Sequence, residues 1–357
     1  MIKSTIKDVA RVAGVSDTTV SLAFQADSRI SDGTRAKVLS AASELSYTPN
    51  LAAKNLRNGS SRTIGFVVND ITNPFYLQMF RKAEDIALQH GYSVIFAGSN
   101  WSAEKEHYLF EQMIQMRVCG IVLCLCEKSA DGIEILDRFR MPYLAVDSYP
   151  DWYTGSYVAN DFRMAGELAA KHLLEQGCRR PAYFTADSAM NNLSAFVEMQ
   201  KSFIAYFNRN RIEMTQDDVI EAGLCIQAGR DAYNRITARG KRHDGIFCAN
   251  DLCAMGVLEA AEKHGIIPGK DIAVIGIDDV EVSGFSKISL TTIRQPYDQL
   301  AEIAMEELVK AIKDRSLPDI KRKLPAELVV RNSSFLEQTL PCRDRCRCDS
   351  PSKSFRL

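Results

Sequence analysis

Asn and Asp residues that directly follow apolar runs are the first residues in this sequence whose types and spacing suit chemistry. Asp147 ends the run PYLAVD, Asn250 and Asp251 follow GIFCA, and Asp278 and Asp279 follow IAVIGI. If these runs are parallel strands, their carboxyl ends share one cleft, where carboxylates and amides can bind the hydroxyl or N–H donors of a small ligand. Such residues are also common turn formers and helix caps, and we favour that plainer role for Asp251 and Asp279.

Nothing in the sequence points to catalysis. It holds no GxGxxG, P-loop, GxSxG or HExxH motif. The histidines mostly fall on helical faces or beside glycine, which favours surface or capping roles; they are His90, His107, His172, His243 and His264. Because no nucleophile or general base has an evident partner, we expect a binding protein without a cofactor or a catalytic metal, and not an enzyme.

The first fifty residues suggest a second kind of chemistry, the recognition of DNA bases. Apolar residues at helical spacing over 6–13 are followed by Gly14, which suits the left-handed residue that ends a helix. Ser16 can cap a second helix over about 17–25, and two short helices joined by such a turn form a helix-turn-helix. In that motif the start of the second helix reaches base edges, which here means Asp17, Thr18 and Leu22.

A third helix, capped by Ser31 and Asp32, would cover the first two. Its predicted apolar face consists of Val38, Leu39, Ala42 and Leu45. A unit of this size has a thin core and little stability alone. Residues 1–62 carry nine Lys and Arg against five Asp and Glu, so the basic end of the chain is the end with the motif. The alternative is a surface helical hairpin that binds no nucleic acid.

Three strings, TIKDVA-x-x-AGVS-x-x-TVS, SxxTR-x-x-V and YTPNLAAKNL, resemble in order and spacing the head and hinge of the LacI/GalR family of bacterial transcription regulators. The resemblance implies a helix-turn-helix head at 1–48, a hinge helix and linker at 49–62, an effector-binding and dimerisation domain at 63–340, and a tail at 341–357. It also places phosphate contacts at six hydroxyl residues, namely Thr5, Ser16, Thr19, Ser21, Ser31 and Thr34.

The base-reading residues have chemistry that suits this role. Asp17 can accept from the amino group of cytosine, Thr18 can bond to either kind of base, and Leu22 can touch a thymine methyl. Asp17 also repels phosphate and suits the first turn of any helix, so its role stays open. The hinge is either a flexible linker or a helix too short to be stable alone, which folds on DNA with a second subunit's copy. The resemblance favours paired hinge helices in the minor groove, with contacts from Ala53, Lys54 and Leu56.

The remainder of the chain alternates apolar runs of strand length with amphipathic helical stretches. The strand candidates are 63–69, 92–98, 120–126, 142–147, 181–186, 245–250 and 272–277. This alternation predicts parallel sheets with helices on both faces, in two lobes because the chain is too long for one comfortable sheet. The expected fold is a small all-α head plus an α/β, two-lobed, periplasmic-binding-protein-like body. By resemblance the N-lobe is about 63–159 plus 292–323, and the C-lobe about 160–291 plus 324–340.

The resemblance also assigns effector-binding residues, which are Asn73, Phe75, Asp147, Asn160, Asn250 and Asp278. An aromatic face with carboxylate acceptors suits a sugar or a nucleobase-like compound. Two departures stand out. Many relatives carry an arginine and a glycine where this chain has Met199 and Ser202, and Leu224 replaces a common aromatic residue. Without the arginine fork, bidentate binding of a carboxylate or diol is disfavoured, so the effector is unusual or weakly bound.

We therefore expect a sequence-specific transcriptional regulator, most simply a repressor. It would bind a palindromic operator in double-stranded DNA as a homodimer and respond to a small-molecule effector such as a sugar. The alternative is a cytoplasmic small-molecule-binding protein, or an activator without repressor activity. A polar N-terminus and the lack of an eighteen-residue apolar run predict a cytoplasmic location and no membrane partner.

The cysteines fall into two groups. Seven of the ten lie in or beside apolar runs, where we expect reduced core thiols. Cys342, Cys346 and Cys348 lie in a polar tail. One interpretation is a soft-metal site, but their spacing fits no common zinc site and a fourth ligand is not evident, so we favour an unstructured tail without a metal. The tail also lacks the heptad helix that makes longer relatives tetrameric, which favours a dimer.

Overall fold

The computed structural model describes residues 4–24, 29–49, 61–126, 128–190 and 192–335. The chain forms two compact units, a helical N-terminal unit and a larger body that holds two sheets. The predicted hinge contacts Ala53, Lys54 and Leu56 and the tail at 341–357 lie outside the described residues. No helix of the described ranges is long and apolar enough to cross a membrane.

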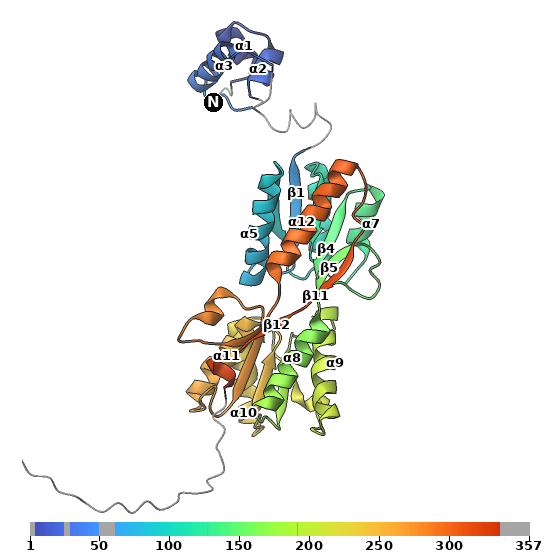
Figure 1. The fold of residues 1–357 in the computed structure, drawn as a ribbon, viewed down its shortest axis with the longest axis vertical. Helices are drawn as coiled ribbons and strands as arrows, with labels where there is room; N and C mark the ends of the chain where they lie inside the picture. Colours follow the sequence, from blue (N-terminus) through green and yellow to red (C-terminus); the bar gives the residue numbers. More distant parts are fainter. Residues whose placement is uncertain (1–3, 25–28, 50–60, 127, 191, 336–357) are drawn as a thin grey trace, which may run out of the picture. The chain divides into compact units, whose positions relative to one another are not determined.

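The N-terminal unit contains α1 (Ile6–Ala13), α2 (Asp17–Ala23) and α3 (Asp32–Glu44), which Figure 1 shows in blue. Gly14 ends α1 with a φ of 67°, as predicted. Ser16 and Ser31 cap α2 and α3, because their hydroxyl oxygens accept from the N–H groups three residues on. The second helix is shorter than the predicted 17–25, since its last turn closes at Ala23.

The core of this unit is thin and consists mainly of valine and alanine. Its buried residues are Val9, Ala10, Val20, Ala23, Val38, Ala41 and Ala42. Leu39 was predicted to be in this core and is exposed. The buried face of α3 consists of Val38, Ala41 and Ala42, and Leu45 packs beside them. Leu39 lies outside this apolar stripe.

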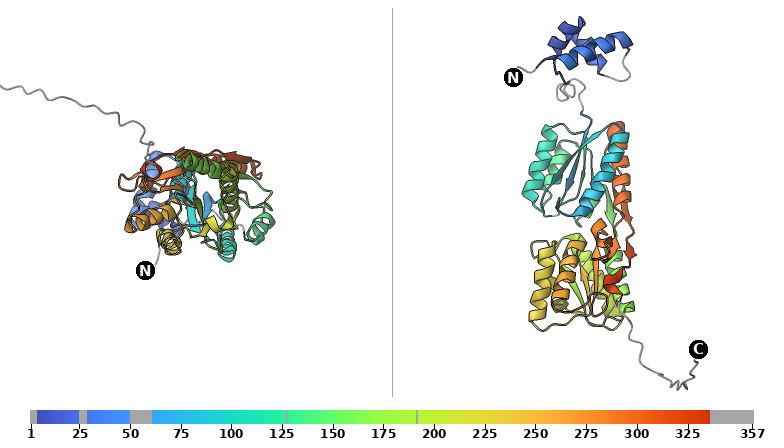
Figure 2. Two further views of the ribbon diagram at one scale, coloured as in Figure 1. Left: turned by 90° about the horizontal axis from the view of Figure 1, so that it is seen from below. Right: turned by 90° about the vertical axis from the view of Figure 1, so that its left-hand side faces the viewer.

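The first sheet of the body has the strand order β11-β5-β4-β3-β1-β2, and its paired strands are parallel. The strands are β1 (Thr63–Val68), β2 (Ser93–Gly98), β3 (Gly120–Leu123), β4 (Tyr143–Asp147), β5 (Tyr157–Asn160) and β11 (Lys321–Leu324). Its helices are α5 (Pro74–Gln89), α6 (Ala103–Gln115), α7 (Asp131–Arg138) and α12 (Tyr297–Asp314). Helix α12 packs on α5 and α6 packs on α7, and Figure 2 shows the two pairs on opposite faces of the sheet.

The second sheet has the order β12-β10-β9-β8-β6-β7, with only the β10–β12 pair antiparallel. Its strands are β6 (Pro181–Thr185), β7 (Val219–Glu221), β8 (Gly245–Cys248), β9 (Ala273–Ile277), β10 (Thr291–Arg294) and β12 (Glu327–Val329). The helices α8 (Phe162–Glu175) and α9 (Ser194–Arg209) pack together, as do α10 (Ile226–Ala238) and α11 (Asp251–Lys263). Short 3-10 helices are η1 (Gln216–Asp218), η2 (Glu281–Gly284) and η3 (Asn332–Ser334).

The two sheets with their helices are the two lobes of the body, and the expected fold class is confirmed. The chain passes between the lobes after β5, β10 and β11, because each of these strands is followed by an element of the other lobe. Strand β10 lies wholly in the second sheet, so the second crossing follows Arg294. The other two crossings follow Asn160 and Leu324.

The apolar runs predicted as strands all form strands, whereas the shorter or more polar strands were missed. Strand β11 has the sequence KRKL and pairs at an edge, and β7 and β12 are edge strands of three residues. The expectation for the cysteines is wrong in part. Cys225 is exposed at the N-terminus of α10 and Cys119 is half-buried, while the thiols of the core are Cys124, Cys126, Cys178, Cys248 and Cys253.

Candidate functional site

A cavity between the lobes collects the polar strand ends of both sheets. It encloses about 500 Å³ of space, counting the open solvent inside it. The first lobe contributes Asn73, Phe75, Tyr76, Trp101, Asp147 and Ser148. The second lobe and the crossings contribute Phe162, Leu193, Ala195, Phe196, Met199, Leu224, Ala249, Asn250, Ile277, Asp278 and Gln295. About 50 Å³ of this space is open to the centre of a water molecule. The lining, with aromatic walls and a few polar groups, suits a small organic molecule.

The structure brings five of the six predicted effector residues together around this cavity, which are Asn73, Phe75, Asp147, Asn250 and Asp278. Asn160 is buried and does not line the cavity. Its amide donates to Asp147 Oδ1 at 2.7 Å, so it holds a lining residue in place. That these residues bind a ligand stays a prediction.

Asp147, the last residue of β4, is buried and has a φ of 80°. Its Oδ2 accepts from the Tyr76 hydroxyl at 3.2 Å. Burial and the Asp147 charge raise the pKa of Tyr76, so the phenol stays protonated and remains a donor. A left-handed backbone is costly for aspartate, and such strain concentrates at functional sites.

Asp278 follows β9 and is likewise buried, with a φ of 128°. Gln295 Nε2 donates to its Oδ1 at 2.5 Å, and Asn73 Nδ2 donates to its Oδ2 at 2.9 Å. Burial, with the nearby charges of Asp251 and Asp147, raises the pKa of Asp278 well above its usual value, while the two amides oppose the rise. Since Asn73 begins α5, its contact with Asp278 joins the two lobes across the cavity.

Asn250 lines the cavity with both ends of its amide already used. Its Oδ1 accepts from the Cys253 N–H at 2.8 Å and so caps α11, and its Nδ2 donates to the Leu224 carbonyl at 2.8 Å. Asn73 serves as a cap in the same way, because its Oδ1 accepts from the Phe75 N–H at 3.0 Å. Both residues therefore hold helix starts and loops at the edge of the cavity in addition to lining it.

The aromatic walls were missed in the sequence. Trp101 follows β2, Phe162 begins α8 and Phe196 lies on α9, and the Trp101 and Phe196 rings are 6.2 Å apart. No local pattern separates these residues from ordinary core residues. Met199 and Leu224, the two departures from the family pattern, both line the cavity. Ser202 does not, because it packs inside α9, where its hydroxyl donates to the Glu198 and Met199 carbonyls.

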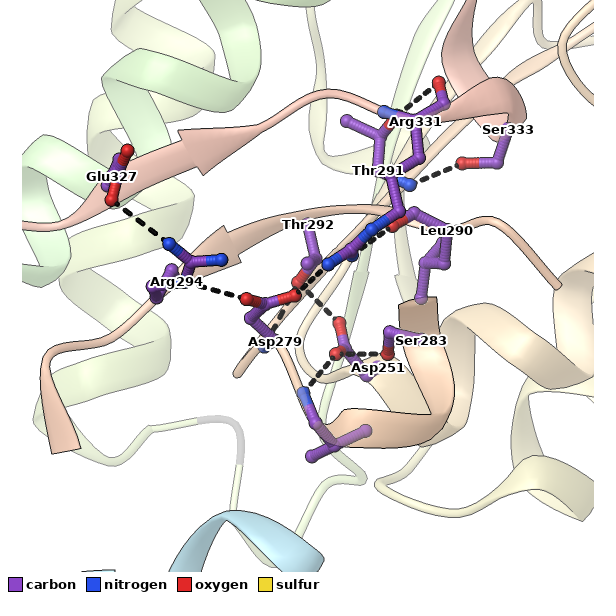
Figure 3. A network of polar contacts seen from close by, with 11 residues as sticks. Asp251, Asp279, Ser283, Leu290, Thr291, Thr292, Arg294, Glu327, Arg331 and Ser333 are labelled. Carbon is purple, nitrogen blue, oxygen red and sulfur yellow. Dashed lines mark hydrogen bonds and ion pairs between the residues drawn. The ribbon is translucent and has the colours of Figure 1, made fainter. Parts of the chain in front are cut away.

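Asp251 and Asp279 belong to a polar network next to the cavity, which Figure 3 shows. Asp251 is fully buried and accepts from the Thr292 hydroxyl at 2.5 Å, the Ser283 hydroxyl at 2.6 Å and the Val280 N–H at 3.0 Å. Burial raises the pKa of Asp251 to about 6, and these three donors oppose the rise. Its role is structural, as expected, although it ties segments together where we expected a cap or a turn.

Asp279 forms the other half of this network. Its carboxylate is 2.7 Å from Arg294 Nε and 2.6 Å from Arg331 Nη2. Arg331 Nη1 donates to the Leu290 carbonyl at 2.8 Å. Together the two aspartates fasten the segment 278–290 to β10 and to the chain after β12, and so fix the position of Asp278.

The N-terminal unit places hydroxyl groups at the starts of its helices. Thr5, Ser16 and Ser31 are the N-cap residues of α1, α2 and α3, and all are exposed. The Ser16 and Thr19 hydroxyls lie 2.9 Å apart, as do those of Ser31 and Thr34. A helix N-terminus with free N–H groups and hydroxyls suits a phosphate. On α2, Asp17 and Thr18 are exposed, while Ser21 and Leu22 are half-buried.

The histidines have structural partners. His90 and His264 are C-caps of α5 and α11, as expected. His172 was expected at the surface and is buried, with its ring 2.7 Å from the Ser334 hydroxyl, and burial lowers its pKa. Among the residues that the structure describes, no group of three or more His, Cys, Asp or Glu side chains is arranged to hold a metal ion.

Comparison with known proteins agrees with this architecture. Residues 5–50 match the family of bacterial regulatory proteins named lacI, and residues 170–334 match a periplasmic binding protein-like domain. The ribose operon repressor of Escherichia coli is 30% identical, with 93% of this chain and 100% of that protein covered. The HTH-type transcriptional repressor PurR of Vibrio parahaemolyticus is 30% identical, with 92% and 98% covered.

A solved structure extends this likeness to three dimensions. The Lac repressor dimer bound to operator and the anti-inducer ONPF has a TM-score of 0.79 at 26% identity, with 94% of this chain and 99% of that chain covered. The chain therefore belongs to the LacI family of bacterial regulatory proteins, and is a ligand-responsive, DNA-binding transcriptional repressor.

Proposed function

We propose that this repressor binds a palindromic operator as a homodimer and is switched by a small metabolite, a sugar or a related compound, in the cavity between its lobes. The observation that carries the proposal is the cavity itself, where two buried aspartates from different lobes meet aromatic walls. The relatives support it, because one solved relative is bound to operator and a LacI-family regulator of Enterococcus faecium has bound ribose. A location in the cytoplasm, where operator DNA lies, follows from this function.

In the head, Asp17, Thr18 and Leu22 read bases. The exposure of Asp17 and Thr18 on one short helix supports this assignment. The hydroxyls of Thr5, Ser16, Thr19, Ser21, Ser31 and Thr34 bind phosphates and set the register, since they gather at helix starts or on α2. Hinge residues Ala53, Lys54 and Leu56 add minor-groove contacts.

Effector binding acts on the contact between the lobes. The Asn73–Asp278 hydrogen bond crosses the cavity, so a ligand that takes over either partner changes how the lobes are held. A ligand shifts such an equilibrium only by its difference in affinity for the two arrangements. The marginal hinge then converts the change into stronger or weaker DNA binding.

The second subunit docks on an exposed apolar groove of the body. Leu77 on α5, with Val282 and Phe285 at η2, lines this groove and exposes much of its apolar surface. Exposed apolar patches of this kind mark interfaces. Phe285→Glu is expected to convert dimers into monomers in analytical ultracentrifugation, whereas Phe139→Glu, at another exposed aromatic residue, leaves the dimer intact.

The test of the function is selection of bound duplexes from a random pool by the full-length protein. Enrichment of one palindrome is expected. Val20→Asp serves as the negative control, because Val20 is fully buried in the thin head core. Thr18→Ala is expected to change which sequences are enriched, whereas Lys54→Ala weakens binding to all of them.

Two results would count against these assignments. Unchanged enriched sequences for Thr18→Ala would refute the recognition-helix assignment. Binding that hardly changes between low and high salt would refute the phosphate contacts, because the release of counterions makes such binding strongly salt-dependent.

A further inference from the structure

The cavity between the lobes is lined by two carboxyl groups and by no cationic side chain. Asp147 and Asp278 both line it, and both are buried. The lining described above includes no Lys, Arg or His. Burial and the neighbouring carboxylates disfavour the charged form of Asp278. A cationic ligand would offset this cost, whereas a neutral or anionic ligand would not.

An acceptor atom without a hydrogen-bond partner also favours a ligand that donates hydrogen bonds. Gln295 lines the cavity and donates its Nε2 to Asp278, while its own Oε1 is buried without a hydrogen-bond partner. Both oxygens of each aspartate already accept from Asn, Gln or Tyr side chains, and a carboxylate can accept more. The unused capacity of these side chains is acceptor capacity, which calls for a ligand rich in N–H donors.

The rest of the lining decides what kind of cation fits. Phe75, Trp101, Phe162 and Phe196 present aromatic surface, and cations are attracted to the faces of aromatic rings. A metal ion would instead require several converging oxygen, nitrogen or sulfur ligands, and the described residues hold no such group. The aromatic lining favours a cation attached to an apolar or ring-shaped body.

We propose that the ligand of this cavity is a small organic cation, whose ammonium or amidinium group binds Asp147 and Asp278 while its ring packs on the aromatic walls. The inference rests on the proposed function, because it names the charge class of the effector. An amino sugar is one compound of this class. Met199 is the residue that permits it, since an arginine at this position would bring a competing positive charge into the cavity.

The experiment is a titration of the full-length protein with ligands matched in shape and different in charge. One series is benzamidine, benzamide and benzoate, and the other is glucosamine and glucose. Isothermal titration calorimetry is expected to show benzamidine binding about tenfold or more tightly than benzamide, with benzoate weakest, and glucosamine binding more tightly than glucose. Cations that bind no tighter than their neutral partners, or that do not bind at all, would overturn the proposal.

Variants locate the effect. Asp147→Asn and Asp278→Asn keep the shape of each side chain and remove its charge, so each is expected to lower the benzamidine-to-benzamide preference. Asp217→Asn, at an exposed carboxylate outside the cavity, is the matched control and should keep the preference. Met199→Arg should reverse it in favour of benzoate. A preference that survives in both aspartate variants would place the cation elsewhere and overturn the assignment.

Duplex selection on the same preparation separates the two proposals. A protein that enriches an operator but shows no preference for cations keeps the regulator function and loses the cation proposal. A protein that prefers cations but enriches no operator keeps the cavity assignment and loses the operator proposal.

Discussion

The body contains two neighbouring sets of buried aspartates that differ in one respect. Asp251 receives hydrogen bonds from Ser283, Thr292 and Val280, all within its own lobe. Asp147 and Asp278 face a cavity, and Asp278 has a donor from each lobe. Burial alone therefore does not mark a functional carboxylate. Whether the oxygens of a buried carboxylate face a cavity is the better indicator of a functional role.

The two sets of aspartates should also differ in how much stability is lost when the carboxylate is removed. When all the donors to a carboxylate are buried protein groups, removing the carboxylate leaves those donors without a hydrogen-bond partner. A carboxylate beside a cavity has neighbours that can turn toward water in the cavity. Asp251 should consequently matter for stability, and Asp278 for ligand binding.

The largest effect is expected for Asp251→Ala. Loss of the carboxylate leaves two hydroxyls and one backbone N–H without an acceptor, and we expect the free energy of unfolding to fall by about 3 kcal/mol or more. Asp278→Ala, the matched variant, should change it by less than about 1 kcal/mol, since it also removes the cost of burying a carboxyl group beside other carboxylates. Urea unfolding followed by circular dichroism measures both, and equal losses would break the comparison.

A buried glutamate extends the comparison to the dependence of stability on pH. Glu106 accepts from the Cys126 N–H at 2.7 Å, and burial raises its pKa to about 7. The folded state then holds this proton up to about pH 7, while the unfolded state releases it near its usual pKa of 4.5, so stability falls as pH rises between these values.

Glu106→Gln should remove this slope. Between pH 5 and pH 8, the free energy of unfolding of the variant should rise relative to that of the parent protein by up to about 3 kcal/mol. Urea unfolding at a series of pH values tests it. The exposed Glu111→Gln on the same helix is the control, and a slope that persists in Glu106→Gln would mean that another group titrates.

The smallest effects are expected from removing a single donor. Thr292→Val takes one hydroxyl from Asp251 and is expected to cost about 1 kcal/mol. Gln295→Leu takes one amide from Asp278, where the cavity can supply water instead, and should cost less. Thermal unfolding of the two variants side by side decides the order, and a larger loss in Gln295→Leu would contradict it.

The fold could be predicted from the sequence where the signal is local. Continuous apolar runs predicted β1, β2, β3, β4, β6, β8 and β9. Gly14, Ser16 and Ser31 marked helix ends through their own backbone and side-chain chemistry. Strand β11 could not be found in this way, because a KRKL edge strand depends on its pairing with β5. The prediction that Leu39 is buried was wrong for a related reason. Which neighbour of Val38 is buried depends on the orientation of α3 about its axis relative to the other helices.

The candidate site was predictable in part. Asp147, Asn250 and Asp278 follow apolar strands, so the sequence places them at one edge, and the family resemblance added Asn73 and Phe75. The resemblance also gave Asn160, which supports Asp147 from outside the cavity. Trp101, Phe162 and Phe196 come from three separate elements and meet only when the lobes assemble. A position after an apolar strand does not by itself distinguish Asp251 from Asp278. The family resemblance assigned only Asp278 to the site, and the folded chain shows that the donors to Asp251 all come from its own lobe.

The separation between the polar network and the cavity lining bears on how such a protein changes over generations. Met199 lies on α9, Leu224 lies between β7 and α10, and Trp101 lies between β2 and α6. None of them takes part in the Asp251–Asp279 network. Lining residues can be replaced one at a time while the framework that positions Asp278 stays intact. A lineage can thus respond to new signals without rebuilding its scaffold.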